Sequence, residues 1–157
     1  MGEERLVFPA DGRQSETALM IARGVRRLLR ARGFSSLTEL PLTDGRRADI
    51  AAVNSEGEVL IVEIKSSPAD FRADRKWRDY MAWCDRLYFA ISERTPAELM
   101  PLEAGLIVAD PYGAEILREA EFRRIAPPSR RALLLRFAQA AADRLHRLAD
   151  PGAGPEF

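Results

Sequence analysis

The sequence is short of several residue types, and each shortage excludes a class of protein. Its one cysteine, Cys84, cannot form an internal disulfide framework, which favours a reducing compartment such as the cytoplasm. With His146 as the one histidine, the chain also lacks the ligand spacing of a structural zinc site. No apolar run approaches the length that spans a bilayer, so we expect no membrane partner.

Charge of one sign is not in excess either. The 24 Lys and Arg residues balance 24 Asp and Glu residues, so the total does not identify a nucleic-acid partner. A local basic surface remains compatible with that balance.

The charged N-terminal segment 1–14 has no signal-peptide core, and the tail 151–157 lacks apolar periodicity, which predicts disorder there. The length predicts a single domain over residues 15–150.

Lysine is scarce among the basic residues. Of the 24, only Lys65 and Lys76 are lysines, and the rest are arginines. Lys65 stands at the end of the apolar run GEVLIVEIKSS, two residues after Glu63. An ammonium is a compact donor that approaches a bound water or a phosphate closely, whereas a guanidinium is forked and always charged. Lys65 is therefore a candidate functional residue.

Apolar periodicity and turn signals predict a mixed sheet with flanking helices, the α/β (α+β) class. Helices are expected over 15–33, 67–83 and 128–150. Strands are expected over 34–42, 46–53, 58–66, 86–92 and 105–110, with an edge strand over 114–120. The expected buried helix stripes are Ala18, Ile21, Val25 and Leu28 in the first helix, and Leu134, Ala138, Ala141, Leu145 and Leu148 in the last.

Two loops predict the register of the first three strands. TDG (43–45) and SEG (55–57) each fit a three-residue hairpin turn closed by a glycine in the left-handed region. The resulting antiparallel meander lines up three carboxylates in one row, those of Glu39, Asp49 and Glu63. A two-residue turn at the first loop would move Glu39 off that row.

Opposed carboxylates need compensation. Directly opposite residues have Cβ atoms about 4.5–5.5 Å apart, where like charges are destabilising unless a cation, a shared proton or open solvent intervenes. Hard oxygen ligands suit Mg²⁺, which accepts one or two carboxylates and keeps several waters. Lys65 lies one pleat further along the same face as Glu63. The alternative is that Glu63 and Lys65 are solvated residues on an edge strand.

Asp49 followed by Glu63-Ile64-Lys65 resembles the motif of the PD-(D/E)XK nuclease superfamily. A longer resemblance, over residues 23–150, is to the MmcB family of bacterial DNA-repair proteins. It is carried by GRRADI, VEIKSSPADFRADRKWRDY, CDRLYFA, GLIVADPYGAEILREA and LRFAQAAADRLHRLADPG. The resemblance implies a restriction-endonuclease-like fold and DNA as a partner. Ala48 replaces the motif's opening proline, which is often absent in the superfamily.

The resemblance also implies residue roles. Asp49 and Glu63 would bind Mg²⁺ or Mn²⁺, with the Ile64 carbonyl as a further ligand, and Lys65 would orient or activate the attacking water. Glu39 and Glu16 are candidates for added acids. The place of Glu16 in a first helical turn is explained equally well by the helix dipole.

A second group of candidates lies on the expected helix 67–83. Lys76 and Tyr80 are spaced to share a helix face, and KWRDY resembles a Gln-x-x-x-Tyr pattern with Lys in place of Gln. With Arg72 and Arg75 nearby, this face is suited to a DNA phosphate. The alternative is a solvated helix face.

Three functions are compatible with these residues. The leading hypothesis is a Mg²⁺-dependent phosphodiesterase acting on DNA. The alternative is a catalytically silent DNA-binding or adaptor protein that keeps the nuclease fold and recruits other DNA-repair proteins. A small-molecule hydrolase ranks last, because no pocket signature supports it. Whether the chain is an enzyme stays open at this stage.

Overall fold

The computed structural model describes residues 15–152. The expectations for segment 1–14, and for the tail beyond residue 152, lie outside the described residues. The helices are α1 (Glu16–Ala31), α2 (Pro68–Ala73) and α3 (Pro127–Ala149), with short 3₁₀ helices η1 (Trp77–Trp83) and η2 (Ala97–Leu99). The strands are β1 (Ser35–Pro41), β2 (Arg47–Val53), β3 (Val59–Ile64), β4 (Arg86–Ile91), β5 (Gly105–Ala109) and β6 (Ala114–Arg118).

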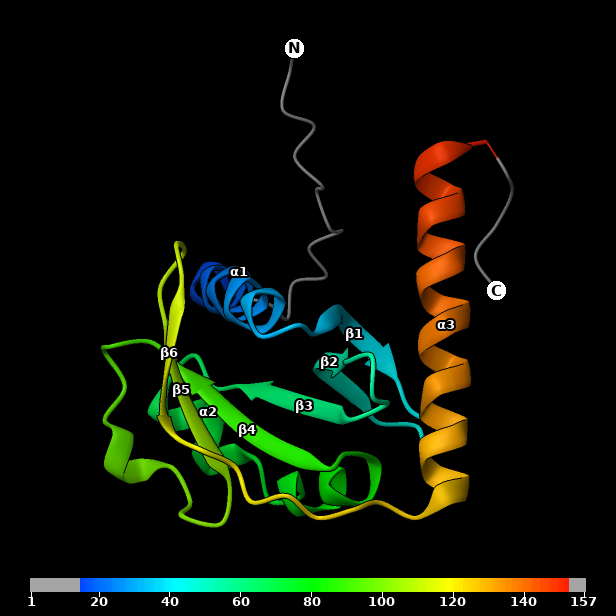
Figure 1. Cartoon of the computed structure of the whole chain (residues 1–157). Coiled ribbons are helices and arrows are strands. Elements are labelled where there is room, and N and C mark those ends of the chain that lie inside the picture. The colour runs from blue at the N-terminus through cyan, green and yellow to red at the C-terminus, as the bar shows by residue number, and fades with distance from the viewer. Residues whose placement is uncertain (1–14, 153–157) are drawn as a thin grey trace.

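All six strands form one sheet in which spatial order equals chain order (Figure 1). β1, β2 and β3 form an antiparallel meander, β3, β4 and β5 are parallel, and β6 runs antiparallel to β5. The predicted mixed sheet, its three-strand meander and its edge strand β6 are therefore confirmed. The arrangement is consistent with a restriction-endonuclease-like fold.

Both predicted hairpin turns are confirmed. The N–H of Leu42 donates to the carbonyl of Arg46 at 2.7 Å, and that of Asn54 donates to Glu58 at 3.2 Å. The closing glycines, Gly45 and Gly57, have φ of 89° and 80°. The strand pairs Thr38↔Ile50 and Ile50↔Val62 follow the register that these turns set.

Glu39 is the exception within β1. Its φ of 50° lies in the left-handed region, and the β1–β2 ladder passes from Thr38 directly to Leu40. From α3, the Arg144 guanidinium donates to the carbonyls of Thr38 at 2.7 Å and Glu39 at 3.2 Å. These bonds satisfy carbonyl groups on the open edge of β1 and compensate for the interrupted ladder.

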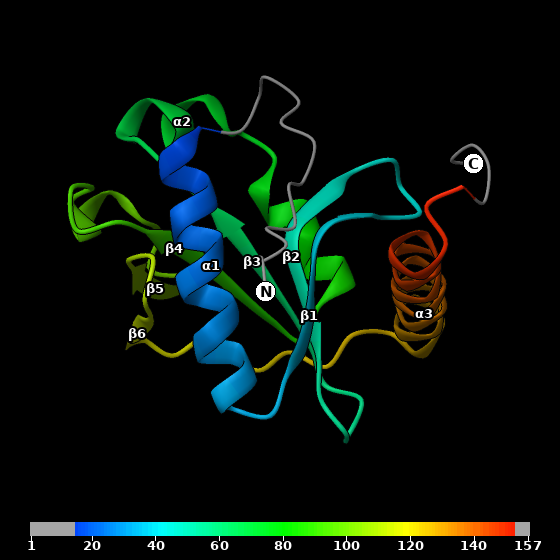
Figure 2. The same cartoon turned by 90° about the horizontal axis from the view of Figure 1, so that it is seen from above.

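The sheet has a hydrophobic core on each face. One core packs the α1 stripe of Ile21, Val25 and Leu29 against alternate residues of the strands, including Val62. The other core packs Trp77 of η1, Leu133 of α3 and the remaining strand residues, including Phe89. Seen from above, α1 crosses one face of the sheet, while α3 stands beside β1 (Figure 2). Glu63 follows Val59 and Ile61 on the η1 face, as the alternation predicts.

Gly24 lies where α1 meets the β5–β6 hairpin. A Cβ atom there would lie far inside van der Waals contact of the carbonyl oxygens of Asp110 and Gly113, which are backbone atoms and cannot rotate away. The absence of a side chain therefore sets how closely α1 approaches the sheet.

Gly24→Ala is expected to lower the free energy of unfolding by about 1–3 kcal/mol or more, the range for overpacked sites. The gain in helix propensity from Ala does not offset this clash. Gly113→Ala is the matched control, since a Cβ there meets nothing within 4 Å. Urea denaturation of both variants measures the difference. Equal stability of the two would contradict the close approach.

The continuous helix predicted over 67–83 is wrong. α2 ends at Ala73, Asp74 is extended with ψ of 106°, and a separate 3₁₀ helix begins at Trp77. The cause is local, because one oxygen of the Asp74 carboxylate accepts the Lys76 N–H at 3.0 Å. This side-chain bond offers the backbone an alternative to the helical ladder. α2 itself is capped by Ser67, whose hydroxyl accepts the Asp70 N–H at 3.1 Å.

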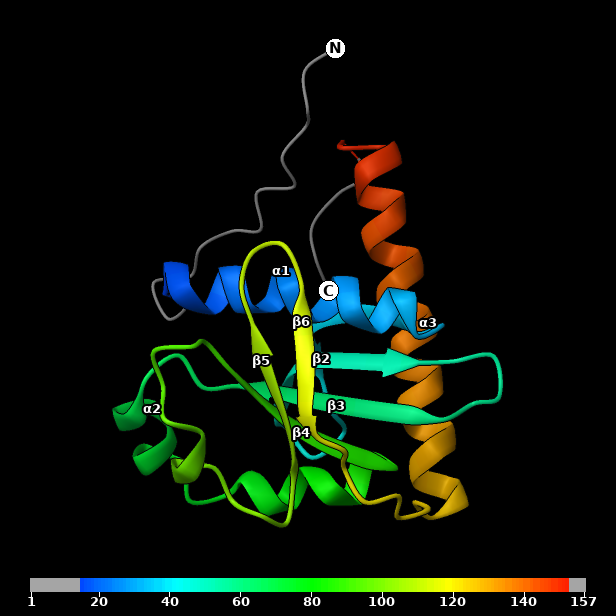
Figure 3. The same cartoon turned by 60° about the vertical axis from the view of Figure 1, so that its left-hand side comes forward.

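The predicted stripe of α3 is wrong in its C-terminal half. Leu133 is buried, and Leu134, Phe137 and Ala140 pack beside it. Of the predicted stripe, Ala138 is exposed, and Leu145 and Leu148 are 67% and 59% exposed. Figure 3 shows the reason, since the last turns of α3 extend beyond the sheet. Periodicity identified the helix, whereas the sheet edge determines which of its turns are covered.

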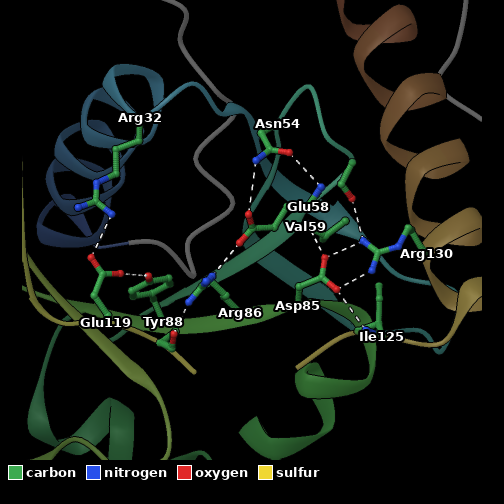
Figure 4. A network of polar contacts seen from close by, with 12 residues as sticks. Arg32, Asn54, Glu58, Val59, Asp85, Arg86, Tyr88, Glu119, Ile125 and Arg130 are labelled. Carbon is green, nitrogen blue, oxygen red and sulfur yellow. Dashed lines mark hydrogen bonds and ion pairs between the residues drawn. The ribbon is translucent and has the colours of Figure 1, made fainter. Parts of the chain in front are cut away.

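The Asp85 carboxylate connects the sheet to α3 and to the segment that leads into it (Figure 4). Its carboxylate, only 1% exposed, accepts the N–H groups of Val59 at 2.8 Å and Ile125 at 3.1 Å. Both terminal nitrogens of Arg130 donate to it at 2.6 Å. Burial alone would raise the pKa of Asp85, but the bonds from Arg130 and the two backbone groups outweigh it and hold that pKa below its usual range.

A membrane-spanning helix is absent from residues 15–152, because none of the helices there combines sufficient length with sufficient apolar character.

Candidate functional site

A cavity of about 380 Å³ opens where β2 begins and β3 ends. Its walls come from the start of α1, these two strand ends and the segment joining α2 to η1. Six of the predicted site residues line it together, namely Asp49, Glu63, Ile64, Lys65, Lys76 and Tyr80. Residues as far apart in the sequence as Asp49 and Tyr80 thus share one concave site.

The Asp49 and Glu63 carboxylates each accept a hydrogen bond from a backbone N–H of the neighbouring strand. The Asp49 carboxylate accepts the Ile64 N–H at 2.8 Å, and the Glu63 carboxylate accepts the Asp49 N–H at 3.1 Å. These bonds continue the β2–β3 contact past Ile50↔Val62, the last regular pair at this end. Glu63 is 4% exposed on a central strand, so the alternative of a solvated edge residue is wrong for it.

The two carboxylates oppose each other's ionisation. The pKa of Glu63 is raised well above its usual range, first by burial and then by the negative charge of Asp49. Burial also raises the pKa of Asp49, against the opposing effect of the hydrogen bond from Ile64. Because the groups are strongly coupled, they titrate as a pair. Without a cation, the pair tends to retain a proton at a pH where ordinary carboxyls have lost theirs.

These features fit a hard divalent cation. The half-buried Asp49 and the buried Glu63 line one cavity. Burial is the main cause of their raised pKa values, and the negative charge of Asp49 raises that of Glu63 further. Over residues 15–152, no group of three or more His, Cys, Asp or Glu side chains is arranged to hold a metal. A cation in this cavity would have the Asp49 and Glu63 carboxylates as donors, with the Ile64 carbonyl as an expected third oxygen. Mg²⁺ accepts such sets, because it keeps several of its waters.

Glu63→Gln is expected to stabilise the metal-free protein near neutral pH. A carboxyl whose folded pKa is raised makes the folded state less stable as the pH rises from about 4, its unfolded pKa, through the folded value. Glutamine removes that loss and keeps an oxygen for the Asp49 N–H. In EDTA, we expect the two proteins to be similar at low pH and the variant to gain more than about 0.5 kcal/mol near pH 7.5, beyond the usual range of surface substitutions.

Chemical denaturation across this pH range measures the effect, with the exposed Glu103→Gln as the control. A Glu63→Gln variant less stable than the parent at pH 7.5 would show that Glu63 is not under electrostatic strain.

Lys65 is buried in the same cavity, with 5% of its surface exposed. Its ammonium donates to a carboxylate oxygen of Asp74 at 2.7 Å. A solvated lysine on an edge strand is therefore the wrong interpretation here as well. Lys65 is therefore fixed in the cavity by Asp74, which lies in the segment between α2 and η1.

Lys76 and Tyr80 reach the cavity in a different way from that predicted. Lys76 precedes η1 as its N-cap, so the two residues do not share the face of one regular helix. The Tyr80 hydroxyl donates to the carbonyl of Arg47 at 3.0 Å. Burial raises the pKa of Tyr80, and the nearby charges of Glu63 and Asp49 raise it further, which keeps the phenol protonated.

Arg72 and Arg75 are exposed on the same segment as Lys76. Within the part of the chain that the structure describes, the side chains of these three residues form no ion pair with an acid. Of the three, Lys76 lines the cavity, and Arg72 and Arg75 do not.

Glu39 and Glu16, like Arg72 and Arg75, do not line the cavity. The Glu39 carboxylate lies 3.7 Å from the Arg47 guanidinium, and Glu16 is exposed in the first turn of α1. Their assignments as added acids stay predictions.

Three charged cavity residues were missed from the sequence: Arg46, Asp70 and Asp74. Arg46 pairs with Asp44 and Asp79, and the Asp70 carboxylate accepts the Ser66 N–H at 3.1 Å. The turn at Asp74 could have been predicted, because an Asp side chain commonly accepts a hydrogen bond from the backbone N–H two residues later.

A second cavity, of about 350 Å³, lies under the C-terminal end of α1 (Figure 4). Its charged groups pair with one another. Arg32 bonds to Glu119 at 3.1 Å, Glu119 accepts the Tyr88 hydroxyl at 2.7 Å, and Arg86 bonds to Glu58 at 2.7 Å. This cavity therefore lacks the uncompensated charge of the first one.

Known proteins are similar to this chain over nearly its whole length. A solved structure from Silicibacter pomeroyi, a protein of unknown function, is 44% identical in sequence with a TM-score of 0.87. The match covers 92% of this chain and 99% of that one. Among curated proteins, none matches. The family model described as DNA repair protein MmcB-like matches residues 7–152, which is nearly the whole sequence. This chain belongs to the MmcB-like family of DNA-repair proteins.

Proposed function

We propose that the protein is a divalent-metal-dependent phosphodiesterase that acts on DNA. The observation that carries the proposal is the meeting of the half-buried Asp49 carboxylate, the buried Glu63 carboxylate and the buried Lys65 in one cavity. Perturbed acids beside a cation in a concave site are typical of catalytic centres. The DNA-repair family supplies the substrate class.

The roles of the residues follow from their chemistry. Asp49, Glu63 and the Ile64 carbonyl would hold Mg²⁺ or Mn²⁺. When bound, the cation supplies charge neutralisation at the phosphate and Lewis-acid activation of water. β2 and β3 keep both carboxylates on rigid strands, which reduces the reorganisation needed during reaction. Lys65 adds a positive charge that stabilises the negative charge developing on the phosphate.

Binding of the DNA backbone would use the cavity rim. Arg72, Arg75 and Lys76 are exposed cations on one short segment, and Lys76 lines the cavity. Contacts of this type orient the nucleic acid without reading its sequence. The proposed substrate is therefore recognised through its phosphates on this side.

One observation favours a second candidate, the catalytically silent adaptor. The Lys65 ammonium bonds to Asp74 at 2.7 Å, so in this conformation the lysine already has a counter-ion. An adaptor would bind DNA and repair proteins on the same fold without needing Lys65 to meet a phosphate.

The test is a cleavage assay on duplex, gapped, flapped and single-stranded DNA, with Mg²⁺, Mn²⁺ or EDTA. The phosphodiesterase proposal requires metal-dependent cleavage of at least one substrate, and its loss in Asp49→Asn. Exposed Asp143→Asn on α3 is the matched control. Metal-independent DNA binding without cleavage of any substrate would reject the proposal in favour of the adaptor.

A further inference from the structure

Both lysines of the chain are tied to one side chain. One oxygen of Asp74 accepts the Lys65 ammonium at 2.7 Å, and the other accepts the backbone N–H of Lys76 at 3.0 Å. Asp74 lies in the short extended link between α2 and η1. A single carboxylate thus contacts the buried lysine of the cavity and the exposed lysine at its rim.

The first contact determines where the Lys65 ammonium lies. Lysine has a flexible four-carbon stem, and Asp49, Glu63 and Asp74 all line its cavity. In the described residues, the ammonium bonds to Asp74 and forms no ion pair with Asp49 or Glu63. Asp74 therefore holds the ammonium by a direct bond, and from there its positive charge only partly offsets the raised pKa values of Asp49 and Glu63.

The second contact determines where Lys76 lies. The bond from the Lys76 N–H to Asp74 closes a turn that stops α2 and starts η1. Without that turn, a continuous helix would carry Lys76 round to another direction. The break is thus a device that brings the second lysine to the cavity rim.

We propose that Asp74 is the positioning residue of the site, which fixes the Lys65 ammonium through one carboxylate oxygen and the Lys76 backbone through the other. The positioning stands on these contacts alone. Its catalytic consequence rests on the proposed phosphodiesterase function. Asp74 contacts neither the expected metal ligands nor, in this arrangement, a reacting atom, so its effect passes through the lysines.

Two reciprocal substitutions separate the two contacts. Asp74→Asn keeps an oxygen for the Lys76 N–H but loses the negative charge that holds Lys65. Asp74→Glu keeps the charge but lengthens the side chain, which disfavours the short bond to Lys76. Exposed Asp143→Asn serves as the control for a lost carboxylate elsewhere. Thermal unfolding of each variant checks that the fold is intact.

The scarcity of lysine makes the ammonium directly observable. In protein labelled with ¹⁵N-lysine, NMR detects two side-chain Nζ groups, and Lys76→Arg identifies the signal of Lys65. A buried, ion-paired ammonium exchanges slowly with water and gives a resolved Nζ–H correlation. We expect this correlation in the parent, in Asp74→Glu and in Asp143→Asn, and its loss or displacement in Asp74→Asn. The Lys76 backbone amide signal should shift in Asp74→Glu and change little in Asp74→Asn.

The cleavage assay measures the consequence. Asp74→Asn should lower kcat by roughly 10²-fold, the scale of a small misplacement of a catalytic group, with a much smaller change in DNA affinity. Asp74→Glu should retain more of kcat and weaken DNA binding instead. This split between kcat and affinity is not expected from general loss of stability.

The positioning role of Asp74 and its catalytic consequence can be rejected independently. An unchanged Lys65 signal in a folded Asp74→Asn variant would overturn the positioning role, even if the parent cleaves DNA. If the parent cleaves none of the DNA substrates, the proposed function fails, and the Lys65 signal still decides whether Asp74 positions the ammonium. Full cleavage by Asp74→Asn with an altered Lys65 signal would overturn the catalytic consequence.

Discussion

Lys65→Ala is expected to lower DNA cleavage by about 10²–10⁴-fold, the usual contribution of a general acid–base or charge-stabilising group. Mg²⁺ binding should stay close to that of the parent, because a protonated ammonium has no lone pair with which to ligate a metal. Single-turnover kinetics with saturating DNA measures the first effect, and calorimetric titration of Mg²⁺ measures the second.

The second lysine provides the matched control for this result. Lys76→Ala should weaken DNA binding and reduce its salt dependence by about one phosphate contact, while cleavage of bound DNA is largely kept. Asp49→Asn should weaken metal binding and cleavage together. A Lys65→Ala variant that cleaves as fast as the parent would remove Lys65 from the mechanism.

Asp85→Ala is expected to cost about 3–5 kcal/mol of unfolding free energy, as when one partner of a buried ion pair is removed. It would leave the N–H groups of Val59 and Ile125 without their acceptor, and the Arg130 guanidinium with the Gly57 carbonyl but no counter-ion. Urea denaturation of the parent and the variant at pH 7 measures the loss.

The control is Glu103→Ala, which breaks an exposed pair with Arg78 and should cost no more than about 1 kcal/mol. The effect of Asp85 should also depend on pH. Its pKa is depressed in the fold, so its stabilisation is present above about pH 4, its unfolded pKa, and is lost as the pH falls through the folded value. The difference between parent and Asp85→Ala should therefore shrink in acid. A constant difference down to pH 2.5 would contradict the ion-pair explanation.

The elements that were predicted well are those encoded locally. The turns at Gly45 and Gly57 set the β1–β2–β3 register within a few residues, and side-chain alternation then brought Asp49 and Glu63 to one face. The place of this part of the site therefore followed from short-range chemistry.

What could not be predicted depends on contacts between distant segments. The bond from Lys65 to Asp74 forms only when β3 and the segment between α2 and η1 pack together. Local sequence pattern contains no trace of that contact, so it predicted a helix that continues through residue 74. The exposure of Leu145 follows from where the sheet ends, which helical periodicity does not contain. Glu39 shows the same limit, because its left-handed φ interrupts a row that ideal strand geometry would complete.

The bonds from Arg144 to the β1 edge have a consequence for the protein during its synthesis. Arg144 is made 106 residues after Thr38, whose carbonyl it covers. Until α3 has left the ribosome and docked, β1 presents an open edge to neighbouring chains. Unprotected edges of this kind template strand addition and aggregation. Newly made chains therefore depend on α3 for protection as well as for stability, and truncations within it should reduce soluble yield.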